Sequence, residues 1–445
     1  MHSLDWGALL SYMPPDYEAL AVAHKQLNTQ WSNAKIASAA VLLRFIFLHV
    51  GGNLPLRQTV EVMAKAGGPR LCAARLHHRM RHAQPYLAAL VERMTSRIQD
   101  EAKPELWGGY EMVCVDGSSI SGPGSDGTDV RLHVVLRLSD LRVLNTEVTD
   151  VTGGETARRF FWSEGQLVIA DRGYANPPGV AWVKSKGADI LVRLNRSSLP
   201  VFDEQDQKRD KPIDVLAWCR ELTGHRATQR VVTVLHRDGT VGSKSISKAI
   251  SGRLVGFRLP AKEAEEARDR ARKEHGADIT EEHLEAAAYV ILFTTAPAER
   301  LSAARCVEAY RLRWQVELQL KRWKSICHFD KLPNYRDDTM LSWVTAKVLL
   351  GLLLDRIGSA QVAVPPGTNR SSRALARTPW KMTSILWPMM MGAIMPLRLR
   401  ETIEILPSLA EDLEAMTDQI DDHQITSFFD RSYPTAQRGA EAPGI

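Results

Sequence analysis

The chain has 445 residues, with 57 Lys or Arg against 52 Asp or Glu and a formal net charge of +5. A hydrophobic content of 44% and a charged content of 24% exclude a largely disordered chain and are typical of a globular protein with a sizeable core. Because the excess of positive charge is small, a nucleic-acid surface would have to come from local clusters of basic residues.

Membrane and disulfide classes are also disfavoured. The longest apolar run, from Val348 to Leu354, is far too short to span a bilayer, and the first residues are acidic, polar and aromatic, which is not the pattern of a signal peptide. The five cysteines are scattered without a CxxC pair, as expected for reduced thiols. We therefore expect a soluble cytoplasmic protein with no membrane contact.

Residues 1–105 have a helical pattern that contains a basic pair of helices. Apolar periodicity predicts helices over 33–50, 54–66 and 71–82, with a Gly-Gly-Pro turn at 67–69. Between 53 and 82 there are six Lys or Arg and one acid. This layout is typical of a helix-turn-helix, in which Arg75 and Arg79 of the second helix would contact DNA. A plain helical hairpin with a solvated basic face explains the pattern equally well.

The next segment alternates strands and helices. Strands are predicted over 110–115, 130–138, 142–148, 166–170 and 189–194, with helices over 153–161 and 177–186. The first strand is expected to end at Asp116 and the fourth at Asp171. Taken singly, an aspartate at a strand end is usually a turn residue. Together, at the carboxyl ends of strands in one sheet, the two are candidates for a ligand site.

Residues 197–297 are expected to add strands over 230–236, 253–259 and 288–295, and a highly charged helix over 261–275 that is more typical of a solvated face than of a DNA contact. After this segment, one helix is predicted over 300–326. On it Tyr310, Arg313, Glu317 and Lys324 would share a face, with Lys321 and Trp314 beside them. Charges spaced four apart would also decorate an ordinary solvated helix.

The spacing Tyr-x2-Arg-x3-Glu-x6-Lys over 310–324, together with Asp-Arg-Gly-Tyr at 171–174, resembles the transposases of bacterial insertion sequences, in the insertion sequence four family. The resemblance implies an α/β protein with an RNase H-like mixed-sheet catalytic core, a β-rich insertion, a helical N-terminal DNA-binding domain and a helical C-terminal region. The corresponding parts are a DNA-end-binding domain at 1–105, the first part of the core at 106–196, the insertion at 197–297, the signature helix at 298–330, a helical region at 331–435 and a disordered tail at 436–445.

The resemblance also implies the chemistry. Asp116, Asp171 and Glu317 would be catalytic metal ligands, and their oxygen atoms favour two Mg²⁺ ions, for which Mn²⁺ can substitute. Asp116 would bridge the two metals, which would drive in-line phosphoryl transfer during cut-and-paste transposition.

DNA would be the partner, both the inverted-repeat ends and the target. Tyr310, Arg313 and Lys324 would hold the strand end by resemblance, and Lys321 and Arg193 are further candidates for phosphate contacts. Trp314 could stack on an unpaired base or be buried in the core. A dimer is expected in the DNA-paired complex. A metal-dependent nuclease of the same fold and a non-catalytic DNA-binding protein derived from a transposase are the alternatives.

Overall fold

The computed structural model describes residues 4–24, 27, 38–99, 108–206, 208–222, 224–241, 244–332, 337–361 and 372–395. Its centre is a nine-stranded mixed sheet with the order β3-β2-β1-β4-β5-β9-β8-β7-β6. The strands are β1 Glu111–Ile120, β2 Val130–Arg137, β3 Arg142–Asp150, β4 Gln166–Ala170, β5 Asp189–Arg193, β6 Val201–Asp203, β7 Thr228–Val241, β8 Lys244–Arg258 and β9 Tyr289–Thr294. The pairs β1–β4 and β4–β5 are parallel, and the other pairs are antiparallel.

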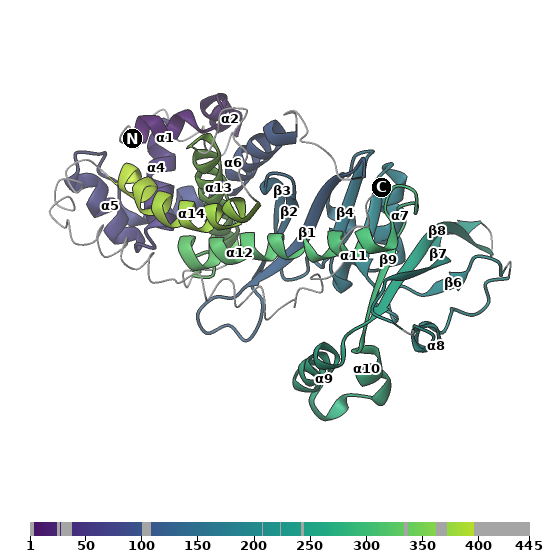
Figure 1. The fold of residues 1–445 in the computed structure, drawn as a ribbon. Coiled ribbons are helices and arrows are strands. Elements are labelled where there is room, and N and C mark those ends of the chain that lie inside the picture. The colour runs from purple at the N-terminus through teal and green to yellow at the C-terminus, as the bar shows by residue number, and fades with distance from the viewer. Residues whose placement is uncertain are drawn as a thin grey trace, which may run out of the picture.

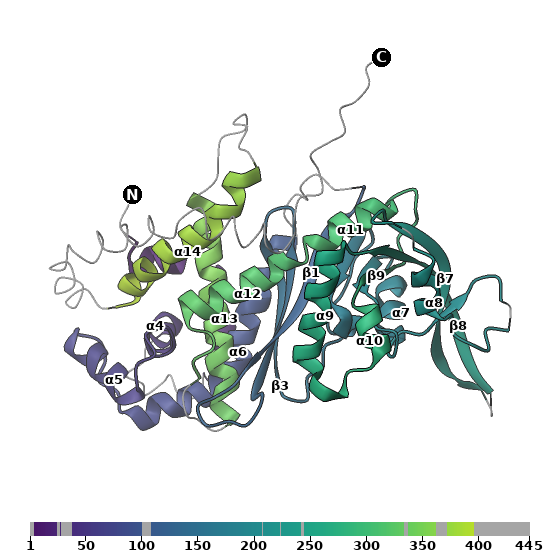
Figure 2. The ribbon, with the colours of Figure 1, turned by 60° about the horizontal axis from the view of Figure 1, so that its bottom comes forward.

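The helices gather mainly at one end of this sheet, as Figures 1 and 2 show. The N-terminal helices are α1 Trp6–Ser11, α2 Tyr17–Ala23, α4 Ala39–Gly51, α5 Leu56–Lys65 and α6 Ala73–Gln99. The later helices at this end are α12 Trp314–Cys327, α13 Asp337–Gln361 and α14 Ser372–Ile394. The remaining helices lie along the β-rich half and are α7 Pro177–Ser185, α8 Val215–Arg220, α9 Ala261–His275, α10 Glu281–Ala286 and α11 Ala303–Arg311.

The sheet separates two hydrophobic cores because successive side chains of a strand point to opposite faces. On β1, Met112 and Cys114 belong to the core shared with the helical end, whereas Val113 and Val115 belong to the core beneath α7. The N-terminal helices, β1 to β3, α12, α13 and α14 contribute to the same core. The predicted N-terminal region is therefore packed onto the sheet.

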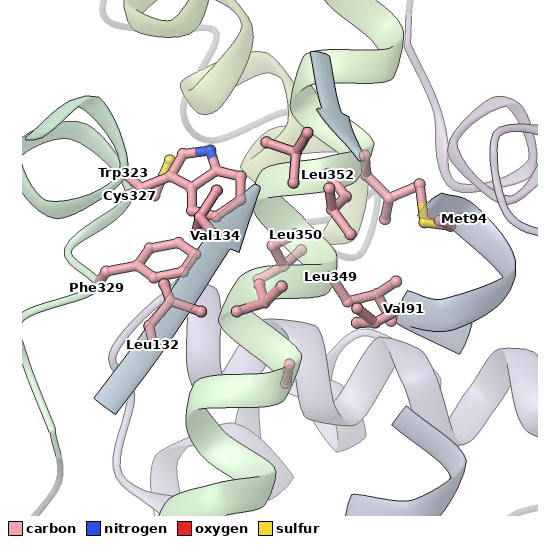
Figure 3. Packing of buried hydrophobic residues seen from close by; sticks show 14 of the residues in the cluster. Val91, Met94, Leu132, Val134, Trp323, Cys327, Phe329, Leu349, Leu350 and Leu352 are labelled. Carbon is pink, nitrogen blue, oxygen red and sulfur yellow. The ribbon is translucent and has the colours of Figure 1, made fainter. Parts of the chain in front are cut away.

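Helix α13 is the hub of the helical end. It packs against α4, α6, α12, α14 and β3. Figure 3 shows Leu350 of α13 between Val91 and Met94 of α6 and the rings of Trp323 and Phe329. Those two rings stack with their centroids 5.0 Å apart. Helix α12 is thus fixed from behind by a continuous apolar layer.

Most predicted elements are present, but two predicted helices in the first half of the chain differ from the structure. Residues 153–161 form only a three-residue 3₁₀ turn, Ala157–Arg159, in place of a helix. The second basic helix, expected to end at 82, runs through Pro85 to Gln99 as part of α6, because its buried residues, among them Leu87 and Leu90, pack in the shared core. Tertiary packing outweighs the hydrogen bond that the proline removes.

The structure tests the expectation for the charged helix at 261–275 but not the one for the C-terminal tail. The acids and bases of α9 pair with one another, as in the ion pairs of Arg268 with Glu265 (2.8 Å) and Arg272 with Asp269 (2.6 Å), which fits a solvated helix. The tail at 436–445, which we predicted to be disordered, and the chain from 396 onward lie outside the described residues. In the part of the chain that the structure describes, no helix is both long and apolar enough to cross a membrane.

Candidate active site

The register of two parallel strands brings Asp116 and Asp171 side by side. The pairing of β1 with β4 ends at Val115 and Ala170, so the next residue on each strand is an aspartate. Asp171 follows β4, as predicted. The prediction that the first strand ends at Asp116 was wrong, because β1 continues to Ile120 by pairing with β2. The two aspartates still lie on neighbouring strands where the parallel pairing stops.

Asp116 is half-buried and surrounded by charge. Burial raises the pKa of Asp116 to about 7. The Arg313 guanidinium and the Gly117 N–H, which donates to Oδ1 at 2.9 Å, lower this pKa, whereas Glu317 and Glu155 raise it. Burial thus disfavours the ionised carboxylate of Asp116, and the attraction of Arg313 does not fully offset it.

The signature helix is two helices. We predicted one helix over 300–326, but α11 ends at Arg311 and α12 begins at Trp314. At the junction the Arg313 N–H donates to Tyr310 O and the Val316 N–H to Arg313 O, each to the carbonyl three residues earlier. This tightening is typical of a 3₁₀ turn, and neither glycine nor proline marks it in the sequence.

The signature side chains nevertheless reach the aspartates. The Tyr310 hydroxyl donates to Asp171 Oδ1 at 3.3 Å, and its burial, followed by the Asp171 charge, raises the Tyr310 pKa. Arg313 Nη2 lies 2.6 Å from Glu317 Oε1. Lys324 Nζ donates to the Ser119 carbonyl of β1 at 3.0 Å. Helices α11 and α12 therefore bring the third carboxylate to the sheet, as Figure 1 shows for the ribbon.

The family assignment follows from comparison of the sequence with known proteins. The family described as the transposase DDE domain matches residues 107–350, which include both aspartates and the signature. The chain belongs to the DDE transposase family.

Curated relatives and one solved structure are similar to this transposase. The putative transposase InsL of insertion sequence element IS186A, from Escherichia coli K12, is 27% identical over 373 residues, which is 83% of this chain and 98% of that protein. The transposase of IS421 from Escherichia coli is also 27% identical, with the same coverage of 83% and 98%. A piggyBac transposase in a synaptic complex with hairpin DNA aligns at a TM-score of 0.42 and 11% identity, over 98% of this chain and 91% of that one.

The remaining DNA-contact candidates of the transposase differ in exposure. Lys321 is exposed, and its Nζ lies 4.2 Å from the ring centroid of Trp314, which is half-buried at the start of α12 and so is not a core tryptophan. Arg193 ends β5. Burial and then Arg193 lower the pKa of Arg172, which follows Asp171, so these two arginines lie close together beside the site.

In the N-terminal helices, the two predicted DNA contacts have different surroundings. Arg75 is exposed near the start of α6. Arg79 is 7% exposed, and its Nη1 donates to the Leu27 carbonyl at 3.0 Å. The expectation that Arg79 contacts DNA from an exposed face is therefore wrong. Arg75, four residues earlier, lies on the same side of α6 and is exposed, but the chain at Leu27 covers Arg79.

Sequence reasoning missed Glu155, His133 and Tyr174, which lie beside Asp116. Partial burial raises the pKa of Glu155, Arg131 lowers it, and Asp171 raises it again. Tyr174 is the last residue of the Asp-Arg-Gly-Tyr motif at 171–174, but we had assigned it no role. No motif marks Glu155, which lies in the loop after β3, or His133, which lies on β2. The glycines at 117 and 173, which leave room for Glu155, are the nearest sequence signal.

The donor set fits a hard divalent cation. The acidic groups supply carboxylate oxygens, and the half-buried Asp116 has like charges around it that a cation would neutralise. Among the described residues, no group of three or more His, Cys, Asp or Glu is yet arranged to hold a metal ion. Glu317 is instead paired with Arg313. For Glu317 to serve as a ligand, this ion pair has to open.

Proposed function

We propose that this DDE transposase moves an insertion sequence by a cut-and-paste route, cleaving DNA at inverted-repeat ends and joining those ends to a target. The observation that carries the proposal is the juxtaposition of Asp116 and Asp171 at the end of the β1–β4 pairing, with the Tyr310 hydroxyl from the signature on Asp171. The order and directions of β3, β2, β1, β4 and β5 support an RNase H-like catalytic core.

In this proposal Asp116, Asp171 and Glu317 hold two Mg²⁺ ions, for which Mn²⁺ can substitute. The ions would activate a water or a 3′-hydroxyl and stabilise the leaving oxygen of the phosphate. The residues of the chain orient the ligands and bind the DNA phosphates. Tyr310 orients Asp171, and Arg313 is freed to bind a phosphate when Glu317 turns toward the aspartates, since a guanidinium binds phosphate as readily as carboxylate.

The DNA path is proposed to follow the same surface. The phosphates would be bound by the ammonium groups of Lys324 and Lys321 and by the bidentate guanidinium of Arg193. We add Arg172, which was not predicted, to this set. Trp314, half-buried beneath Lys321, offers a ring face on which a base can stack. The exposed Arg75 is the candidate for recognition of the element's end. Two protomers would meet on the paired ends in the bacterial cytoplasm, where the DNA lies.

The deciding experiment is Mg²⁺-dependent cleavage of a linear duplex that carries one flanking end of the element. The natural protein is compared with Asp116→Asn and Glu317→Gln at concentrations that give equal binding of the duplex. We expect the natural protein alone to cut, at the boundary of the element. If all three proteins bind the end and none cuts with Mg²⁺ or Mn²⁺, the catalytic proposal is wrong.

End recognition is tested separately with Arg75→Ala and, as its control, Lys262→Ala on the exposed face of α9. Arg75→Ala should weaken binding to the element's end while nicking of unrelated DNA persists. Loss of both activities would show instead that Arg75 supports the fold.

A further inference from the structure

Glu155 occupies a space that two glycines of the active site leave open. An ideal Cβ at Gly117 would lie 3.0 Å from Glu155 Oε1, and one at Gly173 would lie 2.4 Å from Glu155 Oε2. Gly117 directly follows Asp116, and Gly173 is two residues after Asp171. The carboxylate of Glu155 therefore sits against the backbone of both segments that carry the catalytic aspartates.

This carboxylate has no hydrogen-bond or ion-pair partner in the part of the chain that the structure describes. Among the described residues Glu155 makes no hydrogen bond and no ion pair, and its side chain remains in contact with solvent. Asp171 repels its charge, as does Asp116, while Arg131 attracts it without forming a salt bridge. Glu155 is exposed, so solvent moderates this repulsion, and a bound cation would relieve it further.

Two buried polar atoms next to Glu155 are also unpaired. His133 and Tyr174 are both fully buried, and neither His133 Nδ1 nor the Tyr174 hydroxyl has a hydrogen-bond partner in the described part of the chain. His133 Nδ1 lies 3.4 Å from the same ideal Cβ position at Gly117 that Glu155 Oε1 approaches. The Tyr174 hydroxyl is close enough to Glu155 and Asp116 to sense both charges. Such orphaned atoms are costly, and they mark a place where a further ligand completes the contacts.

The charge balance indicates which ligand this is. In the proposed function Asp116, Asp171 and Glu317 bring three negative charges to two divalent cations. Glu155 raises that number to four, which equals the positive charge of the two cations. Carboxylate oxygens are also the ligands that Mg²⁺ and Mn²⁺ prefer.

We propose that Glu155 is a fourth carboxylate of the active site, which binds a divalent cation together with Asp116 and Asp171. The inference rests on the metal site of the proposed function. Gly117 and Gly173 are then required because any side chain at these positions would push the Glu155 carboxylate away from the aspartates.

The test is direct binding of Mn²⁺ to the full chain without DNA, followed by electron paramagnetic resonance of the free ion. Four proteins are compared: the natural chain, Asp116→Asn, Glu155→Gln and Glu164→Gln. Glu164 is the matched control, because it is an exposed glutamate that precedes β4 at the opposite end from Asp171. We expect Glu155→Gln to weaken binding roughly ten- to hundredfold, Asp116→Asn to weaken it at least as much, and Glu164→Gln to bind like the natural chain.

The outcomes separate the two proposals. If Asp116→Asn loses binding while Glu155→Gln binds like the natural chain, the role of Glu155 is refuted and the proposed metal site stands. If the natural chain itself binds no better than Asp116→Asn, the metal site of the proposed function fails, and the Glu155 inference fails with it.

A second variant, Gly173→Ala, tests the role of Glu155 without changing Glu155 itself. Gly173→Ala places a methyl group where the Glu155 carboxylate lies, at a residue that is not among those with positive φ. It should lower Mn²⁺ affinity in the natural chain and have little further effect in the Glu155→Gln background, because the displaced carboxylate is already gone. Equal losses in both backgrounds would overturn the inference.

Discussion

Asp116 and Lys347 are two buried ionisable groups whose surroundings are opposite in kind. Burial raises the pKa of Asp116 and lowers the pKa of Lys347, in each case to about 7. Lys347, which is 1% exposed, donates to three oxygens, those of Asn53 Oδ1 (3.2 Å), Lys331 O (3.2 Å) and His328 O. Asp116 accepts one backbone N–H and faces other carboxylates. A buried polar group whose hydrogen-bond partners all come from the protein can anchor the fold, whereas a carboxylate that faces other carboxylates is a candidate ligand for a cation.

Both groups act on the same element. Lys347 of α13 binds carbonyls just beyond the end of α12, where His328 adopts a left-handed conformation at φ 55°. It also reaches Asn53, between α4 and α5, at φ 48°. Lys347 therefore fixes the far end of the helix that carries Glu317 and ties it to the N-terminal helices. Asp116, on β1, lies near Glu317 in the first turn of the same helix.

The sharpest test of this contrast is Asp116→Asn. We expect DNA cleavage to fall at least about a thousandfold, because the ligand that we propose for the reacting cations is lost. In the absence of metal at pH 8, the same change should raise the free energy of unfolding by about 1–2 kcal/mol, since it removes an ionised carboxylate that faces Glu317 and Glu155. Urea unfolding measures the second effect. Equal or lower stability of the variant would contradict the view that Asp116 is short of partners.

Lys347→Met should show the opposite pattern. It leaves the carbonyls of His328 and Lys331 without a donor in a buried place, so we expect a loss of about 2–4 kcal/mol in the free energy of unfolding at pH 9. Cleavage per folded molecule should persist. Lys331→Met is the control, because that side chain is exposed and should change stability by less than about 0.5 kcal/mol. An equally small loss for Lys347→Met would remove Lys347 from its anchoring role.

The pH dependence of stability sharpens the same point. The folded-state pKa of Lys347, about 7, lies below the usual lysine value, so its contribution is complete above the usual pKa and is lost as pH falls toward 7. Burial is the main cause, Asp330 and Cys327 oppose it, and Lys331 adds to it. The stability advantage of the natural chain over Lys347→Met should therefore shrink between pH 10 and pH 7, by up to about 1.4 kcal/mol per unit. A constant difference across this range would show that the pKa is not depressed.

The smallest expected effect concerns a single phosphate contact. Lys324→Gln should reduce the slope of the logarithm of DNA affinity against the logarithm of salt concentration by about one, because one fewer counter-ion is released. Lys262→Gln on α9 should leave the slope unchanged. A slope that does not change for Lys324→Gln would exclude Lys324 from the phosphate path and leave it with its contact to Ser119.

The sequence by itself determined the parts that depend on local periodicity and spacing. Alternation and apolar runs predicted the central strands and placed Asp171 at the end of β4. The helical spacing predicted that the signature residues share one face while Val316 and Trp323 project to a neighbouring side that packs on the core, and these two residues are buried. These patterns are local consequences of strand and helix geometry.

Tertiary structure alone decided the features that depend on partners far apart in the chain. Strand β1 runs past Asp116 because β2 continues to pair with it, and Arg79 turns inward because the carbonyl of Leu27 lies there. The position of Glu155 depends on room left by glycines on two other segments. The anchoring of Lys347 depends on oxygens from positions as distant as Asn53. Such contacts leave no periodic trace, because the fold brings together residues whose spacing in the sequence carries no signal.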